Sequence, residues 1–529
     1  MDFSQFLANF VPRVARKSKQ VNQAFWLLET TGSADAADLK GTLDSELKLV
    51  FNNPEIYQEL LELEKTGRVK DPLLQRQLNV LLRTFKQNQI SESLLEEISQ
   101  REAALAMAYG KFRPLLKGKQ ASENDLREIL KNEQNVPVRK EAWEASKQIG
   151  RELAPQILAL VRLRNQAAHS LGYSDYFQMQ LDLQEIDGPW LLKTFDDLSQ
   201  RSNAAYLEVL EEIEQAQIAQ FHVEVKELGP WAWGEPFCQE DPLDSHELDQ
   251  LVEGVDFSQS AAAFYTRMGI DVDPILQHSD MYERPGKNQH AFCINMDREE
   301  DIRTLNNVNS TIKWLETVLH ELGHAIYEMG FEPHLPWLLK EPPHMITTEA
   351  MALIAGRKAY TADSLRRLVG EKPKALLQLA DRSLKRRQLI FSRWVLVMTA
   401  FESELYRNPD QDLNTLWWHL VEKYQKIRAP KDRSGKWDWA AKYHIGLAPA
   451  YYYSYLLGEM FASAIEETLV KECQASLESP QAGKLLNKKL FGPGNRMPWN
   501  DLVHHVTGDF LTPDAWIREF ASVRELDLR

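Results

Sequence analysis

The segment STIKWLETVLHELGHAIYEMGF, residues 310–331, has the most informative pattern in the sequence. Apolar side chains recur in it at every third or fourth position, which is typical of a helix with one buried face. These apolar residues are Leu315, Val318, Leu319, Leu322 and Ile326. Ser310 can cap the start of the helix, and Gly330 suits its end. The pattern therefore predicts a largely buried helix between these two residues.

Within this helix, His320, Glu321 and His324 form the pattern H-E-x-x-H. The spacing puts both imidazoles on one helix face, where they can bind one metal ion. Two nitrogen ligands of this kind suit Zn²⁺, and Glu321 can serve as general base toward an attacking water. The alternative is that both histidines are buried in the core, with their ring nitrogens hydrogen-bonded to other protein groups. That alternative needs a separate partner for each buried imidazole on one apolar helix.

A third ligand is expected in the next apolar segment, HMITTEAMALIAGRKA, residues 344–359. A catalytic zinc has three protein ligands and one open position. Glu349 follows His324 by 25 positions and lies among apolar residues, where an unpaired carboxylate costs free energy. Coordination of zinc would remove that cost, whereas exposure in the first turn of a helix is the alternative. We therefore predict one zinc ion per chain, bound by His320, His324 and Glu349.

Most of the 529 residues show the same helical periodicity, as in IYQELLEL at residues 56–63. The best alternating run is HAFCINM, residues 290–296, which predicts one strand of a small sheet. Proline and glycine cluster in a few places, but no long linker or internal repeat separates domains. We expect an all-α protein with a very small β-sheet near the zinc helix, folded as a single domain over residues 1–529 with two helical lobes.

Composition excludes several classes of function. The formal charge of −15 opposes binding to nucleic acid or to an anionic membrane surface. Three cysteines cannot form a disulfide framework and fit a reducing compartment. The N-terminal residues do not read as a secretory signal, and the apolar run from Leu389 is short and interrupted by Arg393. We expect a cytoplasmic protein with no membrane or nucleic-acid partner, and the sequence predicts no oligomeric state.

The zinc pattern is the gluzincin arrangement, and the chain resembles the angiotensin-converting-enzyme family of peptidyl-dipeptidases, with thimet oligopeptidase-like enzymes as more distant relatives. DWAAKYHI, residues 438–445, is similar to the family's segment with a Lys-x-His pair. PAYYYSYLLGEMFA, residues 449–462, contains its Tyr-x-x-Tyr pattern. The pair at residues 290–291 lies 30 positions before His320, as the family's substrate-binding His-Ala pair does. The stretches AWEASKQIGRELAP and TGDFLTPDAWIREF are also similar, so the resemblance spans most of the chain.

The resemblance implies the zinc ligands already predicted, with Glu321 as general base and then general acid. It implies that Tyr455 and His444 donate hydrogen bonds to the oxyanion of the tetrahedral intermediate. It also implies substrate-binding roles for four residues: Lys442 and Tyr452 at the C-terminal carboxylate, and His290 and Ala291 at the peptide backbone. A lysine meets a carboxylate with a full charge, and on an extended segment Lys442 would face the same side as His444.

Four departures from the family pattern concern the site, three of residue type and one of spacing. Ser454 stands where the family has its chloride-binding arginine, which speaks against chloride activation through that ligand. Trp233 stands where a glutamine would help to bind the C-terminal carboxylate. Leu353 replaces the aspartate that orients a ligating histidine, so another group must orient that imidazole. The spacing from His444 to Tyr452 also differs by one residue. These departures weaken strict dipeptide release more than peptidase chemistry.

The sequence thus predicts two lobes around a deep cleft with zinc at its floor, which would admit only oligopeptides. The predicted function is hydrolysis of oligopeptides with release of dipeptides from a free C terminus. An oligoendopeptidase or a carboxypeptidase with the same zinc chemistry is the nearest alternative, and Lys442 favours a C-terminal exopeptidase. A non-catalytic peptide-binding homologue or a helical scaffold is a further alternative. The non-catalytic homologue is disfavoured because H-E-x-x-H, Glu349 and Tyr455 are all present. The scaffold is disfavoured because it does not explain why these motifs occur together.

Overall fold

The computed structural model describes residues 2–243, 247–433 and 435–522. The chain divides into two compact units, each built from segments that are distant in the sequence. The first unit comprises residues 1–89, 245–381 and 457–515, and the second comprises residues 90–244, 382–456 and 516–529. Helices α17 (Lys374–Arg407), α20 (Tyr453–Cys473) and α23 (Asp514–Trp516) each begin in one unit and end in the other.

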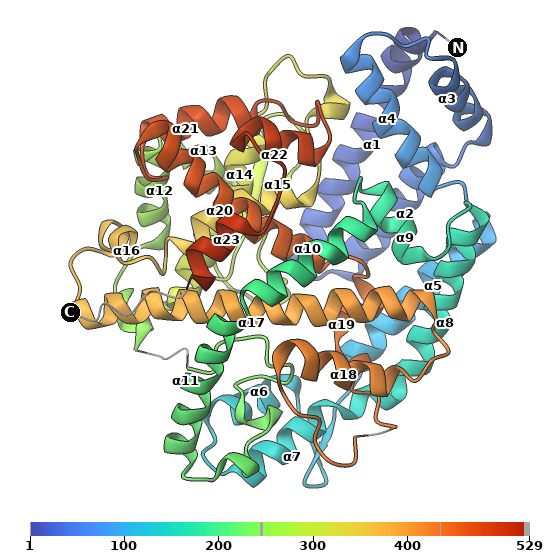
Figure 1. The fold of residues 1–529 in the computed structure, drawn as a ribbon. Helices are drawn as coiled ribbons and strands as arrows, with labels where there is room; N and C mark the ends of the chain where they lie inside the picture. The colour runs from blue at the N-terminus through green and yellow to red at the C-terminus, as the bar shows by residue number, and fades with distance from the viewer. Residues whose placement is uncertain (1, 244–246, 434, 523–529) are drawn as a thin grey trace. The chain divides into compact units, whose positions relative to one another are not determined.

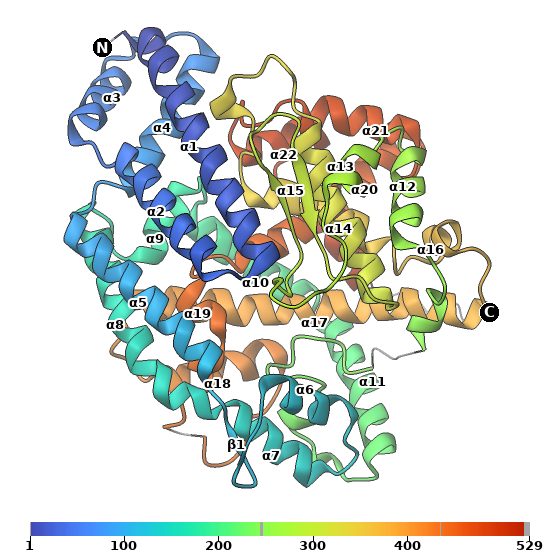
Figure 2. The same ribbon diagram turned by 180° about the vertical axis from the view of Figure 1, so that it is seen from behind.

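Both units are predominantly helical (Figures 1 and 2). The other α-helices of the first unit are α1 (Phe3–Thr31), α2 (Ala34–Phe51), α3 (Pro54–Thr66), α4 (Pro72–Gln87), α12 (Phe257–Arg267), α13 (Asp273–His278), α14 (Ile312–Met329), α15 (Met345–Arg357), α16 (Ala362–Val369), α21 (Pro480–Leu486) and α22 (Trp499–Thr507). Those of the second unit are α5 (Glu92–Lys111), α6 (Glu123–Asn132), α7 (Val136–Ser146), α8 (Gln148–Ser170), α9 (Tyr176–Leu183), α10 (Gly188–Arg201), α11 (Asn203–Phe221), α18 (Leu413–Gln425) and α19 (Tyr443–Leu447). Short 3-10 or π turns are η1 (Val225–Glu227), η2 (Pro230–Ala232), η3 (Leu248–Leu251), η4 (Trp337–Leu339), η5 (Asp438–Ala441), η6 (Asn487–Phe491) and η7 (Ile517–Ala521).

Local sequence signals explain where the N-terminal helices begin. The side chains of Asp2, Ser33, Asn53 and Asp71 each accept a hydrogen bond from a backbone N–H of the first turn of α1, α2, α3 and α4. A proline follows the cap of α3 and α4, where its missing N–H costs nothing. Apolar faces of these helices then pack into a common core that contains Phe10, Leu60 and Phe85.

The strands in the described ranges form two antiparallel pairs. In the first unit, β3 (Phe292–Asn295) pairs with β4 (Ile302–Leu305), with Phe292 opposite Leu305, and both strands contact α14. In the second unit, β1 (Leu115–Leu116) and β2 (Lys119–Gln120) form a short hairpin. The predicted all-α fold with a very small sheet at the zinc helix is confirmed.

The predicted start of the zinc helix is wrong by one residue. Helix α14 begins at Ile312 after Thr311, and no side chain of Thr311 or Ser310 caps it. The Ile312 N–H donates to Asp249 Oδ1 at 3.0 Å, so a residue of η3 replaces the local cap. Gly330 follows the last helical residue, as expected. A Cβ at Gly330 would lie 2.5 Å from Phe491 Cβ, which explains why glycine is needed there.

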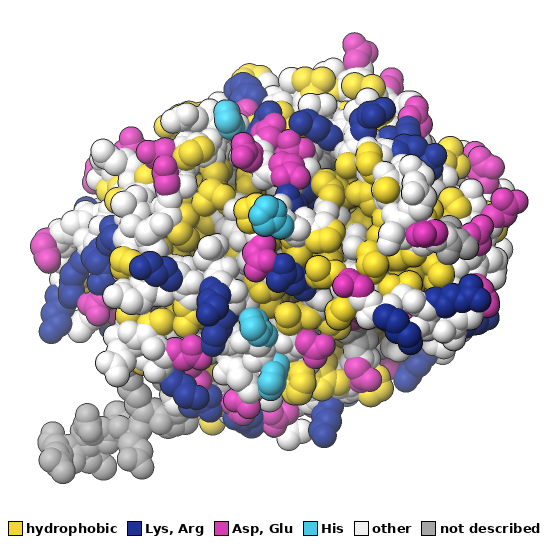
Figure 3. Space-filling view, turned by 90° about the horizontal axis from the view of Figure 1, so that it is seen from above, with side chains coloured by type: hydrophobic (Ala, Val, Ile, Leu, Met, Phe, Trp, Pro, Cys, Tyr) yellow, Lys and Arg dark blue, Asp and Glu magenta, His cyan; other side chains and the backbone are white. Residues whose placement is uncertain are grey.

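The apolar run from Leu389 forms part of α17, the long helix of Figure 1, and is mostly buried, as predicted. Over the described residues, no helix combines the length and apolar content that a membrane crossing needs. Figure 3 shows acidic and basic side chains interspersed with apolar ones on one face of the molecule. The cleft expected between two lobes stays a prediction.

Candidate active site

The candidate zinc site is built on two packed helices of the first unit, α14 and α15, which lie side by side in both ribbon views (Figures 1 and 2). Gly323, inside H-E-x-x-H, permits their close approach. A Cβ at this position would lie 2.7 Å from Ala352 Cα and 3.0 Å from Met351 O, which are backbone atoms of α15. Helix α20 packs on another side of α15, where a Cβ at Gly458 would lie 3.1 Å from Glu349 Cβ. Gly323 therefore permits the short distance between the two helices that carry the ligands, and Gly458 permits the close approach of α20 to α15.

We expect Gly323→Ala to destabilise the protein and to weaken zinc binding, because the new methyl group would push α15 away from α14. Overpacking of this kind costs roughly 1–3 kcal/mol. Denaturant unfolding and a zinc titration measure the two effects. Gly41→Ala is the matched control, since a Cβ at Gly41 of α2 meets nothing within 4 Å and alanine favours a helix. Unchanged stability in Gly323→Ala would contradict the packing argument.

The three predicted ligands come together within the first unit. One donor atom from each of His320, His324 and Glu349 lies within 4.8 Å of the other two. His320 Nε2 is 3.7 Å from Glu349 Oε2, and His324 Nε2 is 3.9 Å from Glu349 Oε1. The imidazole rings are nearly perpendicular, with centroids 4.9 Å apart. Both imidazoles therefore direct Nε2 toward one carboxylate, as a shared cation requires.

The chemistry of the donor set fits zinc. Burial lowers the pKa of His320 to about 4 and that of His324 well below its usual value, so both imidazoles are neutral and keep a lone pair for a metal. Glu349 is buried, and its Oε2 accepts no hydrogen bond from the residues that the structure describes. Burial raises the pKa of Glu349 to about 8, with a further contribution from Glu459. A cation between the three groups would satisfy this carboxylate.

Glu321 lies on the same helix and is 7% exposed. Burial, and then the charge of Glu349, raise the pKa of Glu321 to about 8. Glu321 thus belongs to the same cluster as the ligands, next to His320 in the chain. The arrangement can hold a metal and place a carboxyl group beside it.

A threonine orients one of the two imidazoles. Thr348 Oγ1 lies 2.7 Å from His324 Nδ1, the ring nitrogen that does not face Glu349. The hydroxyl can accept the Nδ1–H, which leaves the Nε2 lone pair for the metal. Thr348 therefore meets the need for an orienting group that Leu353 leaves open at the family's usual position.

We expect Thr348→Val to weaken zinc affinity by roughly 10- to 100-fold, the usual effect of losing a partner of a metal ligand. Valine keeps the shape of threonine but cannot accept the Nδ1–H. Competition with a chromophoric chelator measures the zinc dissociation constant without reference to activity. Thr348→Ser retains the hydroxyl and is expected to bind zinc nearly as the natural protein does. Equal zinc affinity in the valine and serine variants would show that the hydroxyl does not orient His324.

The predicted substrate-binding pair lies beside the small sheet. His290 and Ala291 immediately precede β3, and His290 is exposed whereas Ala291 is half-buried. The His290 N–H donates to Asn288 Oδ1 at 2.9 Å. The pair therefore lies outside the strand, and its role at the peptide backbone stays a prediction.

The remaining predicted residues gather in the second unit around the ring of Tyr452. The imidazole of His444 lies 4.9 Å from this ring and the phenol ring of Tyr455 lies 5.6 Å from it, measured between centroids. Lys442 Nζ lies 5.5 Å from the same ring. The segment from Lys442 to His444 was predicted to be extended, and this is wrong. Lys442 lies between η5 and α19, and His444 is already part of α19. Packing on Tyr452, rather than strand alternation, brings Lys442 and His444 together.

Lys442 is buried and is bonded to a residue that the sequence did not indicate. Its Nζ donates to Gln239 Oε1 at 3.0 Å and lies 5.2 Å from the Phe237 ring and 5.0 Å from the Trp394 ring. Burial lowers the pKa of Lys442 to about 8, against the opposing charge of Glu235. Trp233, the residue at the family's glutamine position, is itself buried. The side-chain amide of Gln239 is thus the group that accepts a hydrogen bond from Lys442.

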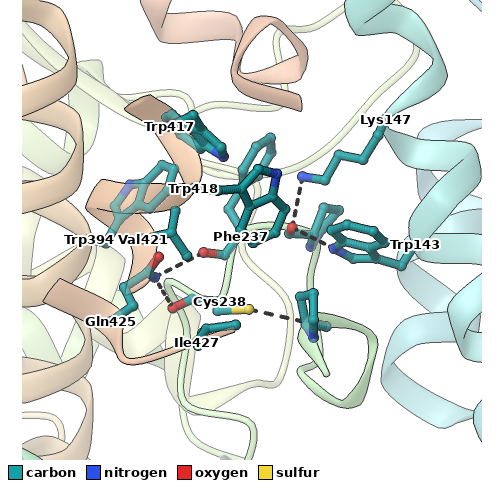
Figure 4. A pocket seen from close by; sticks show the side chains of 12 residues that line it. Trp143, Lys147, Phe237, Cys238, Trp394, Trp417, Trp418, Val421, Gln425 and Ile427 are labelled. Atoms are coloured by element: carbon teal, nitrogen blue, oxygen red, sulfur yellow. Dashed lines mark hydrogen bonds between the residues drawn. The ribbon is translucent and has the colours of Figure 1, made fainter. Parts of the chain in front are cut away.

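Side chains from several helices hold the loop that carries Gln239. Lys147 Nζ and Trp143 Nε1 both donate to Pro236 O, at 2.8 Å and 3.0 Å, and Gln425 Nε2 donates to the carbonyls of Phe237 and Cys238 (Figure 4). These groups line a pocket that is also walled by Trp394, Trp417 and Trp418. The loop is thus fixed by donors from α7, α18 and the residue after α7. These four hydrogen bonds span 89 to 188 positions of the sequence, so no local pattern indicates them.

Comparisons with known proteins match different parts of the chain to two peptidase families. Residues 1–209 match the profile of the family described as angiotensin-converting enzyme, and residues 276–522 match that of peptidase family M3. The angiotensin-converting enzyme-like protein Ace3 of Mus musculus is 24% identical over 436 residues, which cover 73% of this chain and 57% of that protein. The angiotensin-converting enzyme of Bos taurus is 24% identical over 440 residues, which cover 73% of this chain and 32% of that protein.

The chain therefore spans just over half of the first relative and about a third of the second. The M3 match contains the whole zinc motif and Glu349, whereas the other match covers the N-terminal helices. Together with the His-His-Glu cluster, these similarities support a relationship of the chain to the angiotensin-converting-enzyme-like gluzincin peptidases, with peptidase family M3 as a more distant relative.

Proposed function

We propose that this protein is a zinc-dependent peptidase that hydrolyses oligopeptides and releases dipeptides from their free C terminus. The observation that carries the peptidase chemistry is the cluster of His320, His324 and Glu349, whose donor atoms lie within 4.8 Å of one another. Glu321 follows His320 on the same helix and interacts electrostatically with Glu349. The proposal of C-terminal cleavage rests on the buried Lys442 and on the resemblance to the angiotensin-converting-enzyme family.

In the proposed mechanism, the two histidines and Glu349 would hold a zinc ion, which would supply Lewis-acid polarisation of the scissile carbonyl when bound. Glu321 accepts a proton from the attacking water and later delivers it to the leaving amine. The phenol of Tyr455 and the imidazole of His444 donate hydrogen bonds to the oxygen that becomes negatively charged. Thr348 holds His324 in the orientation that presents Nε2.

For the C-terminal carboxylate, Lys442 offers a charged donor at the surface of the Tyr452 ring. Gln239 Oε1 already accepts one of its three N–H groups, so the amide of Gln239 orients the ammonium and can add a donor of its own. A fixed ammonium of this kind measures distance from the chain end and thereby sets the cleavage position. An amidated C terminus lacks the charge that Lys442 would bind.

We expect a peptide with a free C terminus to be cut about tenfold or more faster in kcat/KM than its C-terminal amide, since a charged hydrogen bond contributes roughly 1.5–3 kcal/mol. The preference is expected below the lysine pKa of about 8 and is lost as pH rises above it, because burial favours the neutral amine. Mass spectrometry of the products identifies the bond that is cut. Profiles of kcat/KM from pH 6 to about 10 measure the preference and its pH dependence, because they report the pKa values of groups in the free enzyme.

Lys442→Met keeps the apolar stem and removes the charge, so it should abolish this preference more than it lowers activity on the amide. Lys436→Met is the matched control, because Lys436 is exposed and lies in the same segment. Equal cleavage of both peptides at internal bonds would reject C-terminal recognition. That result would leave an oligoendopeptidase with the same zinc chemistry, the nearest alternative.

A further inference from the structure

The connection between α19 and α20 contains a buried residue in an uncommon backbone conformation. Ala450 has a φ of 54°, in the left-handed region that residues with a Cβ rarely adopt. Its side chain is 2% exposed. This connection joins His444 on α19 to Tyr455 in the first turn of α20, and it contains Tyr452. The conformation at Ala450 therefore sets the relation between the two proposed oxyanion donors.

A buried carboxyl group from another helix holds this conformation. The Ala450 N–H donates to Glu402 Oε1 at 3.0 Å. Glu402 lies on α17 and is 1% exposed, so the hydrogen bond is shielded from water. A residue keeps such a backbone conformation only when the surrounding structure holds it there. Here the imposing contact comes from 48 positions away in the chain.

The geometry points to Glu402 as the positioning residue of this peptidase site: its carboxyl group, by binding the Ala450 N–H, fixes the turn that aligns His444, Tyr452 and Tyr455. Tyr452 transmits the constraint, because its ring contacts those of both His444 and Tyr455. Trp394, also on α17, packs edge-on against Tyr452 with ring centroids 6.1 Å apart. The same helix thus holds the turn at two places.

Neighbouring groups indicate how the carboxyl group acts. Burial raises the pKa of Glu402 to about 8, and the hydrogen bond from the Ala450 N–H and then the charge of Arg164 oppose this rise. The role of the carboxyl group in this turn is that of a hydrogen-bond acceptor for the Ala450 N–H. A glutamine at this position retains the accepting oxygen at nearly the same place. Methionine retains the volume but leaves the Ala450 N–H without its acceptor.

This inference rests on the proposed function, but its first test does not need activity. In the natural protein, the Ala450 amide lies in a turn, but its hydrogen should exchange with solvent as slowly as amide hydrogens in the buried part of α17. Exchange at the rate of an exposed loop amide would overturn the inference. Failure of the proposed function would appear separately, as absence of peptide cleavage by the zinc-loaded natural protein.

Three variants supply the second test. Glu402→Met is expected to speed exchange at Ala450 and to lower kcat by roughly 10- to 100-fold with little change in KM, as misplaced catalytic groups do. Glu402→Gln is expected to keep kcat within about twofold, because it restores the acceptor. Glu404→Met is the control, since Glu404 lies two positions along α17 and pairs with Arg407. Natural kcat and slow exchange in Glu402→Met, or equal losses in the methionine and glutamine variants, would overturn the inference.

Discussion

Glu321→Gln is expected to keep zinc and to lose most of the activity. The amide has the shape of the carboxyl group but cannot accept the proton of the attacking water. General-base catalysis contributes typically about 10²- to 10⁴-fold, so kcat/KM should fall by that factor. The three ligands remain in place, so elemental analysis should find about one zinc per chain in both the natural protein and the variant.

Removal of the metal separates the contribution of zinc to activity from that of the general base. A chelator should abolish cleavage by the natural protein, and added Zn²⁺ should restore it. The same treatment should leave the residual activity of Glu321→Gln low throughout. A natural protein that cleaves peptides after its zinc has been removed would refute the zinc mechanism. A glutamine variant with natural activity would show that another group accepts the proton.

Tyr455→Phe is expected to lower kcat by roughly 10²- to 10³-fold, the usual effect of losing one oxyanion donor. The phenylalanine ring preserves the packing of Tyr455 against Phe391 and Tyr451, whose ring centroids lie 6.0 Å and 5.2 Å away. Since the hydrogen bond forms mainly in the transition state, KM should change little. Steady-state kinetics on one oligopeptide measure both constants.

Two further tyrosine variants test the assignment. Tyr443→Phe is the control, because Tyr443 is 49% exposed and has no proposed role. Tyr452→Phe should affect binding of the C-terminal carboxylate and hence KM. If Tyr452→Phe lowers kcat and Tyr455→Phe does not, the two roles are exchanged within the Tyr-x-x-Tyr pattern.

Local patterns were sufficient for the zinc helix and for much of the secondary structure. The periodicity of residues 310–331 places His320 and His324 on one face because a helix repeats every 3.6 residues. The apolar sequence around Glu349 indicated a buried carboxylate, which is stable only when a cation or hydrogen-bond donors contact it. Both arguments use neighbours in the chain, and such neighbours are fixed by helical geometry before any packing occurs.

The start of α14 shows where local reasoning fails. Ser310 has the right chemistry for a cap, but Asp249 provides the acceptor from a distant turn. A backbone N–H needs one acceptor, and tertiary packing decides which candidate reaches it. The expectation of an extended segment at Lys442 was wrong for a related reason. Contacts with the Tyr452 ring, not strand alternation, bring Lys442 and His444 together.

Only the tertiary structure revealed the residues that support the site. Thr348 approaches His324 across the contact between α14 and α15, Gln239 reaches Lys442 from a loop 203 positions earlier, and Glu402 binds the Ala450 N–H from another helix. Each contact depends on the packing of elements that are distant in the sequence. The chemistry of a ligand or a base is a property of its side chain and its helical neighbours, so the sequence displays it. The orientation of that side chain depends on hydrogen bonds that exist only after the helices have packed.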